Sequence, residues 1–260
     1  AGPCGPCSEL NYDRGPDWGE EGGPLVNGER YLEYYNLVFM QHTQDAEGTV
    51  TGDLPAPSVD TGLGLERMAV LLQGVDDIFG TDVFVPLLAT AGRLTGHTYG
   101  GARDGTDLSL RVIAEHARAV SFLVADGVLP SKEGRGYVLR RLLRRAVRHA
   151  RLLGYEGELM GPMIDAVIEV MGGMYPDLVK QRELITRVAT AEESDFSRRI
   201  AQGLEMVGDA VERARGEGSS QLPGDVAFKL HDTFGFPVDL TAEIAEDAGL
   251  SLDRAEFDDL

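Results

Sequence analysis

Hydrophobic and polar positions in the first part of the chain follow the short spacing of strands. Residues 30–41 (RYLEYYNLVFMQ) are rich in aromatic and β-branched side chains and are bounded by turn residues, so they predict a strand. Residues 49–57 predict a loop. Residues 58–67 predict a second strand, which turns into a helix at about 67–73. The segment 82–95 is apolar at helical spacing and predicts another helix.

Beyond residue 105 the apolar positions recur at the spacing of helices. The segment 96–105 (GHTYGGARDG) contains four glycines and no periodicity, which predicts a linker. A polar connection is expected over 216–224. We therefore expect a mixed α/β portion over residues 1–105 and a mostly helical portion over 106–260. The helices of the second portion are predicted at 107–126, 135–153, 159–171, 177–215 and 239–248.

A ten-residue segment with the sequence SVDTGLGLER carries the strongest functional signal. Gly62 and Gly64 alternate with two leucines, which is the period of a strand. We expect Leu63 and Leu65 to point into a core. The glycines then leave the opposite face bare, so that a flat ligand can lie against the backbone. Arg67 follows, and its planar guanidinium can hold a phosphate or stack on a purine. The segment predicts a shelf for a nucleotide.

Composition narrows the function classes. The chain is 43% hydrophobic, which supports a core, and it carries 43 acidic against 24 basic residues, a net charge of −19. This balance argues against indiscriminate binding of nucleic acid and makes any local group of arginines more informative. No apolar run is long enough to span a bilayer, and the first residues lack the charged and apolar regions expected of a signal peptide. With only two cysteines, a reducing, cytoplasmic location is expected.

One predicted helix concentrates arginine. Seven arginines lie in the 17 positions from Arg135 to Arg151, and no acid occurs between Gly134 and Tyr155. Like charges at helical spacing repel each other, and arginine favours bidentate phosphate contact. Contact with a nucleic-acid backbone is therefore the prediction, with internal salt bridges to acids elsewhere in the chain as the alternative. On a helical wheel the arginines occupy one half, and the other half holds Val138, Leu139, Leu142, Leu143, Ala146, Val147 and Ala150.

The sequence Cys4-Gly5-Pro6-Cys7 matches a thioredoxin-type redox motif. Such a site needs a preceding strand and a helix that starts at the first cysteine, but only three residues precede Cys4. The repeated unit is Gly-Pro-Cys, which is typical of loops, so redox activity is not expected. The five histidines are scattered without the spacing of metal ligands, and no metal site is expected in this chain.

Six motifs, in order, connect the chain with a known family. The chain resembles the alanyl-tRNA synthetases, a family of class II aminoacyl-tRNA synthetases, over essentially all 260 residues. The resemblance implies an α+β fold: residues 1–105 as the C-terminal part of an antiparallel-sheet catalytic domain, and 106–260 as a helical tRNA-recognition domain. The motifs are GPCGPCSE (2–9), NLVFMQ (36–41), PSVDTGLGLER (57–67), RVIAEHARAVSFLVADGVLPS (111–131), GRGYVLRRLLRRAVRHARLLG (134–154) and DTFGFPVDLT (232–241).

The resemblance implies a small-molecule site around the shelf. Asp60 matches a family position that pairs with the ammonium group of alanine, and a buried ammonium needs a charged acceptor. Gly62, Asn36 and Val38 match other positions of the alanine pocket, with Val38 closing it around the methyl group. From the residues alone, Val38 is a plain core residue of a strand. ATP, with Mg²⁺ as the substrate complex, is implied at Gly64, Glu66 and Arg67.

The resemblance also implies contacts with the acceptor stem of tRNA(Ala). Asp232 matches a position that reads the G·U pair of the stem. Lys132 stands where the family usually has asparagine, and an ammonium group cannot accept a hydrogen bond. Two-sided reading of the pair is therefore not expected from Lys132, and contact with a phosphate or a shift of the loop are the alternatives. The arginines implied in tRNA binding are Arg135, Arg140, Arg141, Arg144, Arg145 and Arg148.

Two further parts of the family pattern are absent from these 260 residues. Motifs 1 and 2, which precede GPCGPCSE, are missing, and so is the zinc-binding editing domain that follows. We therefore expect an excised segment or an incomplete gene product that does not aminoacylate alone. The main alternative is a non-catalytic, synthetase-like tRNA-binding module. A freestanding editing protein would need zinc ligands, which the sequence lacks. Expected partners are tRNA(Ala), L-alanine and ATP, without a membrane, and the sequence does not set the oligomeric state.

Overall fold

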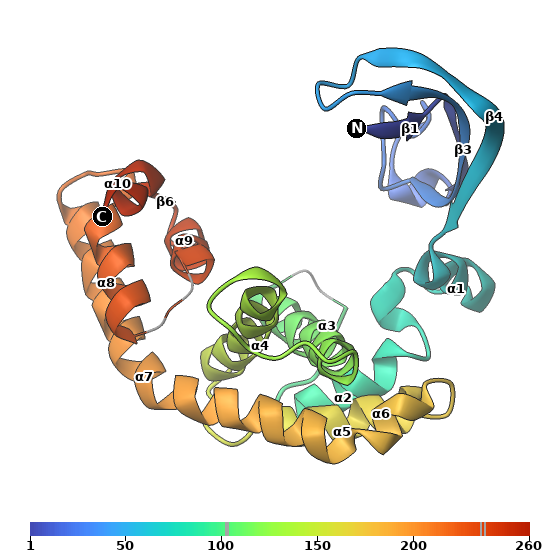
Figure 1. Ribbon diagram of the computed structural model, residues 1–260. Helices are drawn as coiled ribbons and strands as arrows, with labels where there is room; N and C mark the ends of the chain where they lie inside the picture. The colour runs from blue at the N-terminus through green and yellow to red at the C-terminus, as the bar shows by residue number, and fades with distance from the viewer. Residues whose placement is uncertain (102–103, 235, 237) are drawn as a thin grey trace. The chain divides into compact units, whose positions relative to one another are not determined.

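The computed structural model describes residues 1–101, 104–234, 236 and 238–260, with the backbone alone at 199–202 and 234 (Figure 1). The chain divides into two compact units, Ala1–Asp82 and Val83–Leu260. The first unit contains an antiparallel sheet and the second is mostly helical, which confirms the α+β class. The boundary along the sequence lies after Asp82, which is 23 residues before the boundary expected after residue 105. The helix that starts at Phe84 packs on other helices of the second unit.

The sheet of the first unit is organised around one long strand. β3 lies in the middle, with β1 and β2 pairing along it and β4 pairing with it as well, all antiparallel. Figure 1 shows β3 and β4 as a long curved pair. β3 confirms the strand predicted over 30–41. The four strands are β1 (Gly2–Cys4), β2 (Cys7–Asp13), β3 (Tyr31–Gln44) and β4 (Val50–Leu63).

β4 begins earlier than predicted. The loop predicted over 49–57 is wrong, because pairing with β3 resumes at Asp53 after a shift of register from Met40–Ser58 to His42–Asp53. Proline cannot donate to a strand ladder and is tolerated only at bulges or on edge strands. Pro55 and Pro57 fall within this shift, which lets one strand run through a proline-rich segment.

The expected burial of two leucines is wrong. Leu63 is 46% exposed and Leu65 is 68% exposed. The alternation of a strand ends at Leu63, because Gly64 caps the helix α1 (Leu65–Gln73), and Leu65 is already its first residue. β4 itself is exposed along nearly its whole length. The first unit also contains two short 3-10 helices, η1 (Pro16–Trp18) and η2 (Ile78–Gly80).

The doubled Gly-Pro-Cys segment crosses from β1 to β2 in close contact with β3. The Pro6 carbonyl accepts a hydrogen bond from the Phe39 N–H at 2.8 Å. An ideal Cβ on Gly5 would lie 1.8 Å from the Phe39 carbonyl oxygen, so no side chain fits at this position. The glycine and the proline therefore serve a close backbone crossing, which places one cysteine on β1 and the other on β2.

The second unit is built around α3 and α4, which pack on each other and on α7. α2 and α5 pack on α3, and the segment 96–101 follows α2, whereas residues 102 and 103 lie outside the described residues. The helices predicted at 82–95, 107–126, 135–153 and 159–171 are confirmed. They are α2 (Phe84–Thr95), α3 (Gly105–Ala125), α4 (Gly134–Leu152) and α5 (Met160–Met171).

The helix predicted over 177–215 is two helices, α6 (Pro176–Lys180) and α7 (Arg182–Gly216). Gln181 separates them, and its side-chain amide donates to the Ala125 carbonyl at 2.8 Å. The helix predicted over 239–248 is confirmed as α9 (Val238–Asp247). Elements not predicted are β1 and β2 in the first unit, where the Gly-Pro-Cys repeat indicated a loop, and in the second unit α8 (Gly224–Phe234), α10 (Arg254–Asp259) and the parallel pair β5 (Gln221–Leu222) and β6 (Ser251–Leu252).

An aromatic contact fixes the C-terminal helices to α7. Phe236 is fully buried, its ring centroid lies 5.4 Å from that of Phe196, and its ring occupies the space beside Gly203. Phe236 belongs to the DTFGFPVDLT motif, of which Gly235 and Pro237 lie outside the described residues. Among the described helices, none combines the length and the apolar composition that crossing a bilayer requires.

Candidate functional site

The sheet brings the four predicted alanine-site residues together as two neighbouring cross-strand pairs. Val38 of β3 lies opposite Asp60 of β4, and Asn36 lies opposite Gly62. Directly opposite residues of an antiparallel pair project to the same face, and so do residues two apart along one strand. All four positions therefore share one face of the sheet.

This face combines an unpaired carboxylate with bare backbone. The Asp60 side chain is exposed and makes no hydrogen bond or ion pair with the residues that the structure describes. An ideal Cβ on Gly62 would meet no atom within 4 Å. A carboxylate that lacks a protein partner can accept hydrogen bonds from an ammonium group. The bare surface expected at Gly62 is present beside it.

Arg67 is oriented by β3. Its Nη1 donates to the Glu33 main-chain oxygen at 2.8 Å and lies 3.5 Å from Glu33 Oε2. Its aliphatic stem lies beside Gly64, where an ideal Cβ would come within 3.3 Å of the Arg67 Cδ. The Arg67 side chain is 50% exposed, so its guanidinium remains accessible to a ligand. Glu66, its neighbour in α1, is half-buried.

The structure adds Cys7 to this face. Cys7 lies opposite Val38 across β2 and β3, and its thiol donates to Asn36 Oδ1 at 3.3 Å. This contact engages the amide oxygen and leaves the Asn36 amino group as the end that can donate to a ligand. Cys4 and Cys7 are both free. Across the described residues, no group of three or more histidine, cysteine or acidic side chains is arranged to hold a metal ion.

Five arginines of α4 are paired with acids of the second unit, and two of them share one acid of α7. Arg140 and Arg144 each donate through Nε to Glu192 Oε1 of α7, at 3.1 and 2.8 Å. The Arg144 guanidinium also lies 5.0 Å above the ring of Phe196. Arg144 is 4% exposed, so it offers no surface to a phosphate. These two arginines therefore form internal salt bridges, which was the alternative given in the sequence analysis.

The same holds for the arginines that face α9. Arg141, Arg145 and Arg148 form ion pairs with acids of α9. Arg148 is 3% exposed, whereas the side chains of Arg141 and Arg145 are 42% and 36% exposed. The predicted contact of Arg148 with RNA therefore conflicts with its burial. Contact by Arg141 and Arg145 stays a prediction, and both already have carboxylate partners.

Two cations at the start of α4 are accessible. Lys132 and Arg135 are exposed and form no hydrogen bond or ion pair with the described part of the chain. An ideal Cβ on Gly136 would lie 2.2 Å from the Leu129 carbonyl oxygen and 2.3 Å from Ser131 Oγ. The loop before α4 thus lies tightly against Gly136, which fixes the position of Lys132. Asp232 is exposed on α8.

A comparison with protein families decides the family. The family model described as tRNA synthetases class II (A) matches residues 1–260. The chain belongs to this family.

The names of the relatives of this class II synthetase chain agree with the family that its sequence motifs resemble. It is 54% identical over 98% of its length to an alanine–tRNA ligase of Parafrankia sp. (strain EAN1pec), of which it covers 29%. It is 50% identical to an alanine–tRNA ligase of Streptomyces avermitilis and 46% identical to one of Corynebacterium diphtheriae, with 29% and 30% of those proteins covered. The chain thus spans less than a third of the length of these curated relatives.

The sequence analysis of this synthetase chain missed three contact residues. Cys7 was set aside as part of a loop, although the Gly-Pro-Cys repeat places the second cysteine on a strand beside the NLVFMQ segment. Glu192 and Glu243, which neutralise α4, lie about 50 and 100 residues from their arginines, in the segments 182–216 and 238–247. No local pattern in the sequence links them to α4.

Proposed function

We propose that the chain is a segment of an alanine–tRNA ligase, which activates L-alanine with ATP and transfers it to the 3′ end of tRNA(Ala). The segment supplies the alanine pocket, part of the ATP site and a surface for the acceptor stem. The observation that carries this proposal is the β3–β4 register, which places Asn36, Val38, Asp60 and Gly62 on one face. The names of the relatives support the same activity.

The proposed chemistry has two balanced steps. An oxygen of the alanine carboxylate attacks the α-phosphorus of ATP, the bond to the β-phosphate bridge breaks, and alanyl-adenylate and pyrophosphate form. A ribose hydroxyl of the tRNA 3′ end then attacks the activated carbonyl, loses its proton and releases AMP. No side chain becomes covalently attached, so catalysis consists of positioning and charge stabilisation. Mg²⁺ enters with ATP as the substrate complex.

Each residue has a role in this proposal. Asp60 accepts hydrogen bonds from the substrate ammonium, and Asn36 donates from its amino group, oriented by Cys7. Val38 contacts the methyl group. Gly62 leaves space for the adenylate against the backbone. Arg67, held by Glu33, lies against the nucleotide, and Gly64 and Glu66 line the same end of the site.

Replacement of Gly62 by alanine tests the pocket. Because an added Cβ meets no protein atom within 4 Å, the fold has room for it, and an alanine in a strand is slightly more favourable than a glycine. In the proposed pocket the same methyl group occupies space assigned to the ligand. We expect the KM for alanine to rise about tenfold in alanine-dependent ATP–pyrophosphate exchange, a loss on the order of 1.4 kcal/mol of binding free energy.

The measurement uses the full-length protein that carries this chain, with thermal unfolding as the control for stability. Gly105→Ala is a matched variant, since an added Cβ there also meets no atom within 4 Å and the proposal gives Gly105 no side-chain role. Absence of alanine-dependent exchange in the unsubstituted full-length protein would contradict the proposed function. An unchanged KM in Gly62→Ala, with exchange present, would remove Gly62 from the pocket.

The tRNA surface is proposed at the start of α4 and on α8. Lys132 and Arg135 carry charges without partners among the described residues, and Asp232 is an exposed acceptor. Contacts from lysine and arginine to phosphates fix the position of a nucleic acid, and base edges are read by donors and acceptors. Lys132 and Arg135 are therefore assigned to phosphates, and Asp232 to the base pair.

Replacing Arg135 by glutamine is expected to weaken tRNA binding and reduce the slope of log Kd against log salt by about 1, because one phosphate contact is lost. The measurement is a salt titration of tRNA affinity with the full-length protein. Arg187→Gln, an exposed arginine of α7 with no assigned role, is the matched control. Equal slopes in Arg135→Gln and in the unsubstituted protein would show that Arg135 does not contact the backbone of the tRNA.

A further inference from the structure

Three acids on one face of α9 meet three arginines on one face of α4. Asp239, Glu243 and Asp247 are spaced four residues apart, so they form one ridge along α9. Each acid pairs with an arginine of α4, and the partners are 98, 98 and 99 residues apart in the sequence. Successive acids therefore pair with successive arginines, and each of these ion pairs is called a rung. We call this set the α4–α9 ladder: Arg141 with Asp239 at 2.8 Å, Arg145 with Glu243 at 3.0 Å, and Arg148 with Asp247 at 2.8 Å.

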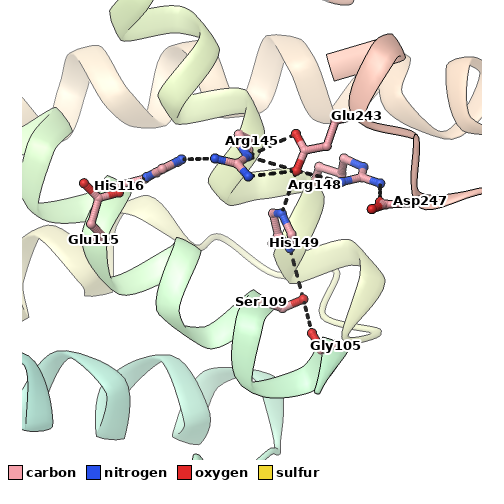
Figure 2. A network of polar contacts seen from close by, with 9 residues as sticks. All are labelled: Gly105, Ser109, Glu115, His116, Arg145, Arg148, His149, Glu243 and Asp247. Carbon is pink, nitrogen blue, oxygen red and sulfur yellow. Dashed lines mark hydrogen bonds and ion pairs between the residues drawn. The ribbon is translucent and has the colours of Figure 1, made fainter. Parts of the chain in front are cut away.

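In the middle rung, Glu243 has Arg145, Arg148 and His149 around its carboxylate (Figure 2). Glu243 accepts from Arg145 Nε through both carboxylate oxygens at 3.0 Å. Its Oε1 also lies 3.6 Å from Arg148 Nη1 and 3.5 Å from His149 Nε2. Burial opposes ionisation of Glu243, but the neighbouring His149 and the charges of Arg145 and Arg148 outweigh it and lower its pKa to about 2.

The network continues from the middle rung into α3. The Ser109 hydroxyl donates to the Gly105 carbonyl at 2.8 Å, and Ser109 Oγ also lies 3.0 Å from His149 Nδ1. His149 therefore turns Nε2 toward Glu243. On the other side, Arg145 Nη1 lies 3.4 Å from His116 Nε2. Figure 2 shows these side chains as a continuous path between α3, α4 and α9.

The C-terminal helices thus have two different attachments. Phe236 anchors them to α7 by apolar packing against Phe196, which is not directional. The ladder attaches α9 to α4 through charge-assisted hydrogen bonds, which are directional and specify orientation. α9 follows α8, the helix that carries Asp232, and α8 packs on α9. α8 also packs on α7, so the ladder is one of two contacts through which the orientation of α8 against α4 is set.

We propose that Arg145 and Glu243 are positioning residues for the tRNA acceptor stem. The middle rung holds α8, with Asp232, at a fixed place relative to the start of α4, where Lys132 and Arg135 are exposed. Asp232 and the two cations then meet a base pair and the phosphates of one stem at the same time. This inference rests on the proposed function, since it assigns a tRNA role to those three residues.

A competing arrangement makes an opposite prediction. The acids of α9 could occupy arginines that otherwise bind phosphates, in which case their removal frees cations and tightens tRNA binding. The burial of Arg148 favours the positioning role, because its guanidinium is 3% exposed and keeps Asp247 as a partner, so removing the Glu243 carboxylate does not offer it to a phosphate.

The test replaces Glu243 by glutamine in the full-length protein. We expect the KM for tRNA in aminoacylation to rise roughly tenfold, because a small displacement of a recognition group weakens binding strongly. Alanine-dependent ATP–pyrophosphate exchange is expected to stay unchanged, since that reaction does not use tRNA. Glu246→Gln is the matched control, because Glu246 is an exposed acid of α9 outside the ladder.

A double-mutant cycle separates positioning from direct RNA contact. If Arg145 acts through Glu243, then Arg145→Gln and Glu243→Gln each raise the KM for tRNA, and the double variant raises it no further. If Arg145 contacts RNA itself, the two effects multiply. The outer-rung variant Arg141→Gln, at a side chain 42% exposed, gives a milder form of the same change should the middle-rung variants fold poorly.

The outcomes distinguish this inference from the proposed function. No exchange activity in the unsubstituted protein would contradict the proposed function. With exchange intact, an unchanged or lowered KM for tRNA in both Glu243→Gln and Arg141→Gln would overturn the positioning role. So would multiplicative effects in the cycle, or a parallel loss of exchange in Glu243→Gln, which would mark general destabilisation.

Discussion

Replacing Asp60 by asparagine in the full-length protein is expected to raise the KM for alanine about a hundredfold in ATP–pyrophosphate exchange. The change keeps the size of the side chain but removes the charge that pairs with the substrate ammonium. Hydrogen bonds to charged groups contribute about 1.5–3 kcal/mol, and the upper end of this range is about two powers of ten in affinity. Stability should not change, since Asp60 is exposed and has no partner in the described residues.

Asp53→Asn on the same strand is the matched control. Asp53 is an acid of β4 with an 86% exposed side chain, and its partner is His42 at 2.8 Å rather than a proposed substrate group. An equal rise in both variants would point to a general electrostatic effect of β4. An unchanged KM for alanine in Asp60→Asn, with unchanged unfolding, would place the ammonium group elsewhere.

Replacing Glu243 by glutamine is expected to lower the stability of the 260-residue chain by about 3 kcal/mol at neutral pH, with the difference vanishing toward pH 2. The pKa of Glu243 is lowered from 4.5 to about 2 in the folded chain. A lowered pKa in the folded state adds stability above the unfolded value of 4.5, and this contribution is lost as the pH falls through about 2. The magnitude follows from about 1.4 kcal/mol per pKa unit.

Chemical unfolding of both chains between pH 2 and pH 7 measures this difference. Other carboxylates with lowered pKa, such as Asp13 beside Arg30, are present in both proteins and cancel in the comparison. Glu246→Gln, at an exposed position of α9, should show no pH-dependent difference. A constant difference between Glu243→Gln and the unsubstituted chain over the whole range would mean that Glu243 is not ionised in the cluster.

Strong local patterns were sufficient for most regular elements. The aromatic and β-branched run at 30–41 predicted β3, and the apolar spacing of α2 to α5 predicted those helices, because each pattern is set by which face an element buries. β4 was cut short in the prediction, because Pro55 and Pro57 argue against a strand when the sequence is viewed alone. Only the shift of register at an edge strand makes room for them.

α8 and the break at Gln181 depend on contacts that are distant in the sequence. An ideal Cβ at Gly224, the first residue of α8, would lie 2.6 Å from the Asp253 carbonyl oxygen, so the start of α8 depends on a contact with a residue 29 positions later. Gln181 leaves the helix while it donates to Ala125, 56 residues earlier. Neither partner is visible in a local window of the sequence.

In the candidate site, too, some residues could be predicted from the local sequence and others depended on contacts distant in the sequence. Arg67 was predicted from one short motif and Asp60 from the family resemblance of that motif, and the pairing of Asn36 with Gly62 needed the register of two strands. The arginine face of α4 was predicted correctly as a face, but its partners lie in α7 and α9. A helical wheel shows that charges share a side, and it cannot show whether the neighbour is RNA or a carboxylate.

The nearly constant separation of the ladder partners restricts how this part of the chain can change length. Insertions between Arg148 and Val238 that lie in loops leave both ridges intact. One residue inserted within α9, between Asp239 and Glu243, would turn the later acids by about 100° and remove two rungs at once. We therefore expect natural and engineered variants to accommodate indels in the connections and to keep the length of α9 unchanged.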